Sequence, residues 1–349
     1  MSKLYSNPFV WGNPVSGNRY VSRATEEEQI RDCLEKDQQV ILTGPRGAGK
    51  TSLVQKASRD QPGENLYLDL SFVVDGASLV YLLAKTIRQV VPALKEDPRL
   101  NAHPDVGLDI SLEEIFHILR SYLKEAEQKI IIIWDEFQHI VKLKEDVLTE
   151  LKRVMNGQGS IMNVIVSHRE DLMEQAFLKK GERGLPRKCH LKIDTIDLVG
   201  FRSFLTRFFR RMGLNDFDLP DALLKFTGGQ AYLTQRFAAA VASCWLEGTT
   251  TRLKDRALKK LLNEMDAEFS SRWDQFGVNE KRLLLGLAHG YSRPTELSFI
   301  DRFGLSATST AHNTVLKLLR EGWLTNRDEG YYVYDPLFLT WLKKRNDIS

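Results

Sequence analysis

The sequence of 349 residues has few cysteines and no long hydrophobic run. Cys33, Cys189 and Cys244 are far apart and odd in number, and none has a CxxC partner or a nearby histidine at metal-ligand spacing. This pattern indicates neither a disulfide framework nor a zinc site, and it fits a reducing cytosol. The longest apolar run, Phe237 to Leu246, is too short to span a membrane, and the N-terminal residues lack the apolar core of a signal peptide. We therefore expect a cytoplasmic protein without a membrane segment.

The sequence also lacks a strong charge of either sign. Its net charge is +3, and residues 251–349 carry 16 Lys and Arg against 13 Asp and Glu. Such a mild excess is far from the dense basic face that binds nucleic acid non-specifically. The remaining composition, 42% hydrophobic and 27% charged, is that of a globular protein, and the length allows two or three folded units.

The most informative stretch is QVILTGPRGAGKTS, residues 39–52, which reads as a buried strand, a glycine-rich turn and the start of a helix. It contains the pattern G-x-x-x-x-G-K-T. Glycines in such a turn can adopt positive φ and let backbone amides point at a phosphate chain. Lys50 supplies a cation for the β- and γ-phosphates and Thr51 a hydroxyl for Mg²⁺. The expected nucleotide-binding residues are Gly44, Pro45, Arg46, Gly47, Ala48, Gly49, Lys50, Thr51 and Ser52.

The second half of the predicted site begins at residue 130. The apolar run Ile130 to Trp134 is typical of a strand buried on both faces of a parallel sheet, and Asp135 and Glu136 follow it directly. Ligands bind at the carboxyl ends of such strands. We expect Asp135 to hold Mg²⁺ together with Thr51, and Glu136 to polarise the attacking water.

Two residues ahead of the phosphate loop are candidates for holding the base. Val21 and Arg23 precede a predicted helix, where they could grip a nucleotide base. A plain lead-in to the helix explains them equally well.

Weaker signals complete the candidate catalytic set. The strand 160–167 ends in Ser167 and His168, either of which could sense the γ-phosphate or orient water, unless they form only a strand-ending turn. Arg187, in a basic loop, could reach a γ-phosphate in its own chain or in a neighbouring subunit, unless the loop is merely solvated. With Lys50 and Glu136, we take His168 and Arg187 as catalytic candidates.

The pattern along the chain predicts three parts. Strands and helices alternate over 1–195, which we expect to be a P-loop ATPase domain of α/β class with a parallel sheet and an N-terminal lead-in. Resemblance of its motifs to NTPases with a separate catalytic glutamate implies the strand order 5-1-4-3-2. Residues 196–270 read as a helical lid, and 271–349 as a winged helix. We assign no element to residues 92–110, which contain several prolines.

The predicted winged helix raises the question of DNA binding. Its helix from about residue 307 would present mostly polar side chains to a major groove, namely Thr308, Ser309, His312, Asn313 and Lys317. Because phosphate contacts need Lys or Arg, a role in protein contact or self-gating is favoured over base reading.

These motifs together resemble the archaeal-type ATPases of the STAND group, relatives of AAA+ proteins. The most specific parts are GPRGAGKTSL (44–53) and IIIIWDEFQHI (130–140), and the ending YYVYDPLFLTWLKKR (331–345) is also similar. The lead-in ends in YVSR where the family usually has a glycine in place of Ser22. The family's Gly-Ser after the fourth strand is replaced by Ser167-His168, and the lid lacks its Gly-x-Pro.

The resemblance implies a slow ATPase that uses ATP and Mg²⁺ as a switch. ATP binding would be coupled to a shift of the lid and the winged helix, to a protein partner and to nucleotide-dependent homo-oligomerisation, plausibly in signalling or defence. The main alternative is a DNA-binding initiator or a transposition regulator that uses the winged helix. A scaffold that binds nucleotide without hydrolysis is a third reading, which Glu136 makes less favoured.

Overall fold

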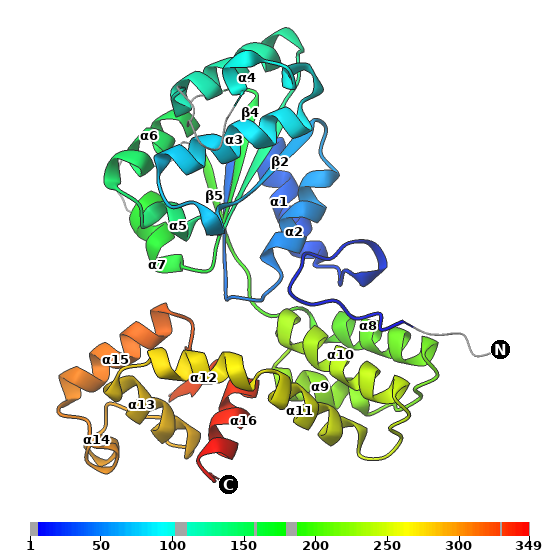
Figure 1. Ribbon diagram of the computed structural model, residues 1–349, viewed down its shortest axis with the longest axis vertical. Coiled ribbons are helices and arrows are strands. Elements are labelled where there is room, and N and C mark those ends of the chain that lie inside the picture. The colour runs from blue at the N-terminus through cyan, green and yellow to red at the C-terminus, as the bar shows by residue number, and fades with distance from the viewer. Residues whose placement is uncertain (1–5, 102–109, 157–158, 179–186, 329, 349) are drawn as a thin grey trace. The chain divides into compact units, whose positions relative to one another are not determined.

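The computed structural model describes residues 6–101, 110–156, 159–178, 187–328 and 330–348 (Figure 1). The chain divides into two compact units. One comprises Ser22–Asp194, and the other combines the residues up to Val21 with Thr195–Ser349. Among the described residues, no helix combines the length and the apolar character needed to cross a membrane.

The first unit is built on a parallel sheet of five strands. They are β1 (Gln39–Thr43), β2 (Glu64–Asp69), β3 (Ile130–Asp135), β4 (Ile161–Ser167) and β5 (Lys188–Lys192), in the order β2-β3-β4-β1-β5. This is the predicted order 5-1-4-3-2 read from the other edge, so the predicted topology is confirmed. Asp69 pairs with Asp135 and Thr43 with Ser167. The carboxyl ends of four strands therefore meet at one edge of the sheet.

Helices cover both faces of this sheet. On one face lie α1 (Ala24–Glu35) and α2 (Lys50–Arg59), and on the other α3 (Gly76–Val90), α4 (Leu112–Glu125) and α6 (Glu145–Met155), with the short α5 (Gln138–Val141) and α7 (Glu170–Met173) nearby (Figure 1). Alternate residues of β3 serve the two cores: Ile131 and Ile133 pack with α1 and α2, Ile130 and Ile132 with α3 and α4. Because both faces are covered, β3 reads as an unbroken apolar run.

Local sequence fixes the ends of two of these helices and part of the stretch that had no assignment. Ser111 and Glu114 form a capping box at the start of α4, and Asp75 and Ser78 form one at the start of α3. Residues 92–101 form two 3₁₀ turns, Pro92–Leu94 and Pro98–Leu100, whose leucines are buried. Residues 102–109 lie outside the described part of the chain.

The expectation that the chain has no disulfide is wrong. Cys33 on α1 is bonded to Cys189 on β5, although 156 residues separate them in sequence. The packing of α1 against the sheet brings the pair together, which spacing along the chain could not reveal. Cys244 is free and buried.

The second unit is mainly helical. It contains α8 (Leu198–Arg211), α9 (Leu219–Thr227), α10 (Ala231–Leu246), α11 (Leu253–Glu264), α12 (Asp266–Gln275), α13 (Val278–Ala288), α14 (Leu297–Phe303), α15 (Thr308–Arg320) and α16 (Pro336–Arg345), with a hairpin of β6 (Leu324–Arg327) and β7 (Gly330–Val333). The described lead-in up to Val21 groups with this unit, whereas the sequence was expected to place it with the ATPase domain. The ring of Phe9 lies 5.1 Å from that of Phe209, and Asn7 Nδ2 donates to Ala239 O at 2.8 Å.

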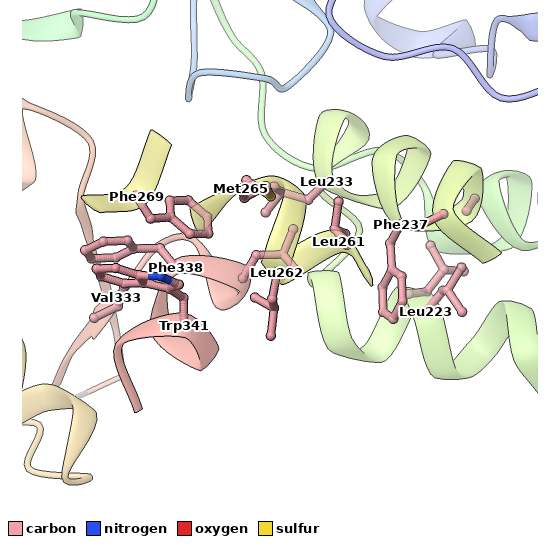
Figure 2. Close-up of a cluster of buried hydrophobic side chains, with 14 of the residues drawn as sticks. Leu223, Leu233, Phe237, Leu261, Leu262, Met265, Phe269, Val333, Phe338 and Trp341 are labelled. Atoms are coloured by element: carbon pink, nitrogen blue, oxygen red, sulfur yellow. The ribbon is translucent and has the colours of Figure 1, made fainter. Parts of the chain in front are cut away.

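One hydrophobic core runs through this unit (Figure 2). The part drawn in Figure 2 runs from α9 and α10 through α11 to α12, β7 and α16. Its labelled members are Leu223, Leu233, Phe237, Leu261, Leu262, Met265, Phe269, Val333, Phe338 and Trp341. Hydrogen bonds cross the same region, from Gln230 Nε2 to Tyr334 O and from Trp341 Nε1 to Asp266 Oδ1, each 2.7 Å long. The predicted lid and winged helix thus share a core, and a domain boundary at residue 270 stays a prediction.

Reduction of the Cys33–Cys189 bond is expected to lower the free energy of unfolding by about 2–4 kcal/mol, because the bond closes a long loop in the unfolded chain. Urea titrations with and without dithiothreitol measure the loss. The Cys244→Ser variant is the control and should respond in the same way as the wild type.

A thiol count in urea without reductant should find the single thiol of Cys244. Finding three reactive thiols in protein kept under air would contradict the bond.

Candidate active site

The phosphate loop connects β1 to α2 at the carboxyl edge of the sheet. Gly44, Gly47 and Gly49 have φ of 155°, 75° and 88°, values that residues with a side chain rarely adopt. A Cβ at Gly44 would also lie 2.4 Å from Ile193 O, so the close approach of Ile193, the residue after β5, requires glycine there. The loop leads into the N-terminus of α2, whose first amides have no partner within the helix. Such a terminus is suited to an anion.

Lys50 is the first residue of α2 and folds back over the loop. Its Nζ donates to Gly44 O at 2.8 Å and to Pro45 O at 2.7 Å, and the residue is only 7% exposed. Burial lowers the pKa of the ammonium to about 8, although the nearby charges of Glu136 and Asp135 act in the opposite direction. The cation thus lies within the field of both carboxylates that were predicted to complete the site.

Asp135, at the tip of β3, is gripped by three donors. Thr51 Oγ1 donates to Asp135 Oδ2 at 2.6 Å, Tyr67 OH donates to the same oxygen at 2.9 Å, and Glu136 N donates to Oδ1 at 2.9 Å. Burial raises the pKa of Asp135 even though the hydrogen bonds from Thr51 and Tyr67 lower it. The contact joins residues that are 84 positions apart in sequence.

These groups fit a magnesium ion. A hydroxyl and a carboxylate are the hard oxygen donors that Mg²⁺ prefers, with water and substrate phosphates as its remaining ligands. In the part of the chain that the structure describes, no cluster of three or more His, Cys, Asp or Glu could hold a metal alone. Thr51 and Asp135 are therefore the residues that would hold Mg²⁺ once phosphates supply the other ligands.

Glu136 has an unusual backbone and a crowded carboxylate. Its φ is 56°, in the left-handed region that side chains disfavour. His168 Nδ1 lies 3.2 Å from Glu136 Oε2, and Gln138 Nε2 donates to that same oxygen. Burial alone would raise the pKa of Glu136, but the hydrogen bond and charge of His168, the hydrogen bond from Gln138 and the charge of Lys50 lower it to about 2. Because an ionised carboxylate only accepts, His168 Nδ1 carries the proton of this contact.

The structure places the weaker candidates in different positions. His168 lies beside Glu136, and its role in sensing the γ-phosphate or orienting water stays a prediction. Arg23 is buried, and its Nη2 donates to Ala48 O of the phosphate loop and to Asp194 O, so the side chain contacts backbone and does not present a free edge to a base. Val21 is buried in the core of the other unit.

Arg187 is not gathered with the other catalytic candidates. It precedes β5, and its carbonyl accepts from Gln39 N, at the N-terminal end of the parallel β1. The phosphate loop follows Thr43, at the opposite end of that strand. Within one chain Arg187 is therefore on the wrong edge of the sheet, and only its action on a neighbouring subunit stays a prediction.

Two contributors were missed from sequence. Tyr67 lies within the strand-like stretch NLYLDL, where Leu66 and Leu68 face one core and Tyr67 packs on the other, the side of α2. That alternation is the one signal that could have found it. Gln138 is 1% exposed and joins Glu136 to Ser167, whose Oγ donates to Gln138 Oε1 at 2.8 Å. Its position two residues after Glu136 gives no such signal.

The chain matches two known families. Residues 20–237 match the family described as an ATPase domain predominantly from Archaea, and residues 267–344 match a probable winged helix domain. None of the curated proteins matches the chain.

Solved structures share the fold over nearly the whole length. A Walker-type ATPase of Pyrococcus abyssi has a TM-score of 0.72 and 18% identity, with 95% of this chain and 98% of that chain covered. The ORC2 protein of Aeropyrum pernix, in its ADPNP–ADP complexes, has a TM-score of 0.58 and 14% identity, with 99% and 98% covered. The ORC1 protein of Aeropyrum pernix, in complex with DNA, has a TM-score of 0.54 and 13% identity, with 95% and 94% covered. At these identities the similarity shows the fold alone.

Binding of Mg·ATP at pH 8.5 is expected to take up protons. With a pKa of about 8, Lys50 is mostly neutral at that pH, and adjacent phosphates would raise its pKa and protonate it, an uptake of roughly three quarters of a proton. At pH 7 the ammonium is already charged, so little uptake is expected. Calorimetry in two buffers of different ionisation enthalpy measures the difference.

The matched variant for this experiment is Lys50→Arg, whose guanidinium stays charged at both pH values. It should bind without uptake at pH 8.5, whereas Lys56→Met, on the same helix, should behave as the wild type. Equal apparent heats in both buffers at pH 8.5 for the wild type would contradict the lowered pKa of Lys50.

Proposed function

The chain belongs to the family of ATPase domains found predominantly in Archaea, and from that premise we propose that this ATPase works as a slow molecular switch driven by Mg·ATP. The proposal rests chiefly on one observation, the 2.6 Å contact between Thr51 and Asp135 beside the buried ammonium of Lys50. That arrangement brings a phosphate-binding cation and a magnesium-binding pair to one edge of the sheet.

Each group then has a chemical role. The loop amides and Lys50 would bind and orient the β- and γ-phosphates, and Thr51 and Asp135 would hold the ion. When bound, Mg²⁺ neutralises charge that develops on the phosphates during transfer. Glu136 orients the attacking water and accepts its hydrogen bond. Tyr67 holds Asp135 in place through their hydrogen bond.

The state of Glu136 supports slow turnover. A carboxylate with a pKa of about 2 binds a proton weakly, so it is a poor general base at neutral pH. It is also engaged by Gln138 and His168, and it must share or leave these donors to contact water. A switch needs a nucleotide state that lasts, and this restraint on Glu136 would provide one.

The second unit is the output of the proposed switch. Because the helices after Thr195 and the winged helix share one core, we expect them to respond to nucleotide as a single body, in contact with a protein partner or with further copies of the chain. The proposal also includes assignment to the STAND group, a role in signalling or defence, and a cytoplasmic location. We also propose that the chain divides into three domains, residues 1–195, 196–270 and 271–349.

A DNA-binding initiator or transposition regulator is the second candidate. The match to a winged helix domain favours it, as does the shared fold with ORC1 of Aeropyrum pernix, a protein whose structure is in complex with DNA. Against it, Lys317 on α15 forms an ion pair with the buried Glu280, so this cation of the proposed reading face is already neutralised. The switch acting on protein therefore remains the favoured function.

Replacement of Glu136 by glutamine should leave Mg·ATP binding within about threefold of wild type and reduce steady-state hydrolysis by roughly 10²–10⁴-fold, since the amide lacks the charge and the second acceptor oxygen with which the carboxylate orients and polarises water. Phosphate release and equilibrium binding are measured on the same preparations. Glu35→Gln, an exposed change on α1, is the matched control and should retain activity. Undiminished turnover by the Glu136 variant would remove that residue from the mechanism.

Titration of duplex DNA at several salt concentrations separates the two candidates. A DNA-binding protein with several phosphate contacts loses affinity steeply on a log–log plot against salt. We expect weak binding with a shallow slope, with ADP and with a non-hydrolysable ATP analogue alike. A steep slope in either nucleotide state would favour the DNA-binding function.

A further inference from the structure

Arg23 lies at the point where the chain passes between its two units. The chain crosses twice, once between Val21 and Ser22 and once between Asp194 and Thr195. Arg23 is therefore one residue past the first crossing. Its side chain, only 3% exposed, contacts the second crossing as well as the phosphate loop.

The contacts of the guanidinium are specific. Its Nη2 donates to Ala48 O at 2.9 Å and to Asp194 O at 2.7 Å, while Nη1 donates to Glu26 Oε1 at 3.0 Å. Both hydrogens of Nη2 are thus used on backbone carbonyls. One side-chain nitrogen thereby joins two segments that are far apart in sequence.

The backbone of Arg23 is also fixed. Arg23 N donates to Glu27 Oε1 at 2.9 Å, and Ser22 Oγ donates to the same oxygen at 3.0 Å. Glu27 is itself buried. The first crossing is therefore held on α1, and Arg23 cannot shift freely to absorb a movement of its partners.

Because a peptide bond is planar, these contacts also fix the orientation of a backbone amide in the phosphate loop. The carbonyl of Ala48 and the amide of Gly49 belong to one planar trans peptide, in which they point in opposite directions. By holding Ala48 O, Arg23 sets the direction of the Gly49 amide on the other side of the loop. In the same way, Asp194 O belongs to the peptide bond with Thr195, which is the second crossing itself.

We propose that Arg23 is a positioning residue that links the phosphate loop to both chain crossings. When a bound phosphate moves the peptide between Ala48 and Gly49, Arg23 transmits that movement to Asp194 and Thr195. This inference rests on the proposed ATP switch. It identifies the contacts of Arg23 with Ala48 O and Asp194 O as the route by which nucleotide at the loop affects the second unit. It also replaces the expected role of Arg23 in gripping the base.

Hydrogen exchange with and without nucleotide tests the link. The readout is the difference in amide exchange between ADP and a non-hydrolysable ATP analogue with Mg²⁺, over peptides covering 192–198 and 20–26. The test variant is Arg23→Lys, which retains a charge beside Glu26 but has a stem about 1 Å shorter, too short to serve both carbonyls. Affinity for the analogue is measured in parallel.

We expect Arg23→Lys to bind the analogue within about fivefold of wild type, while the nucleotide-dependent difference at 192–198 falls to less than about one third. Arg31→Lys and Glu26→Gln are the controls. The first is a partly exposed change on the same helix, and the second removes the charge of the partner of Arg23 Nη1 without touching the two carbonyl contacts. Both should retain the wild-type difference.

The outcomes separate this inference from the proposed function. A wild-type protein whose exchange does not depend on nucleotide would overturn the switch and, with it, the role of Arg23. If the wild type responds and Arg23→Lys responds fully, the switch stands and the inference fails. A parallel loss of affinity and response would also count against it, since that result indicates only a damaged loop. Should Arg23→Lys not fold, Arg23→Gln, whose amide can serve one carbonyl, is measured by the same criteria.

Discussion

The hydrogen bond between Thr51 and Asp135 is the contact on which the site depends, and the sheet makes it possible. The strands that carry these residues are not neighbours, because β4 lies between β1 and β3. A buried side-chain network spans the same three strands: Trp134 Nε1 donates to Asn163 Oδ1 at 2.8 Å, and Asn163 Nδ2 donates to Gln39 Oε1 at 2.9 Å. Polar groups buried in this way must pair, so the network favours one register of the three strands. Their carboxyl ends then meet at fixed spacing.

Glu136 illustrates a conflict between position and reactivity. Its left-handed backbone costs roughly 1–3 kcal/mol, which the surrounding structure must offset. Part of that support comes from Phe137 N, which donates to Val166 O at 3.0 Å and holds the turn on β4. The donors Gln138 and His168 also fix the carboxylate, and the same contacts keep its pKa low and weaken it as a base. In the proposed switch, hydrolysis would be restrained by the same contacts that hold the residue in place.

The second unit shows how packing limits independent movement. A winged helix that binds DNA as a separate domain needs only a flexible connection to its neighbour, but here Leu262, Met265 and Phe269 continue one core from the helical region into α16. Separating the two parts would expose this apolar surface to water at a cost of roughly 25 cal/mol per Å². Within this unit, the helical region and the winged helix therefore hold together as one body.

The sequence by itself determined the features that depend on local pattern. The glycines of the phosphate loop, the apolar run before Asp135 and the alternation of strands with helices predicted a parallel α/β domain and the Lys50, Thr51 and Asp135 set, because each is encoded within a few neighbouring residues. The strand order followed from resemblance to related NTPases. Only the tertiary structure decided which distant groups meet. Strand register places Tyr67 next to Asp135. Packing of α1 on the sheet brings Cys33 to Cys189. Because β5 is parallel to β1, Arg187 lies at the edge of the sheet opposite the phosphate loop. The buried side chain of Arg23 contacts two carbonyls and so joins three separate segments of the chain. No single stretch of sequence carries that information.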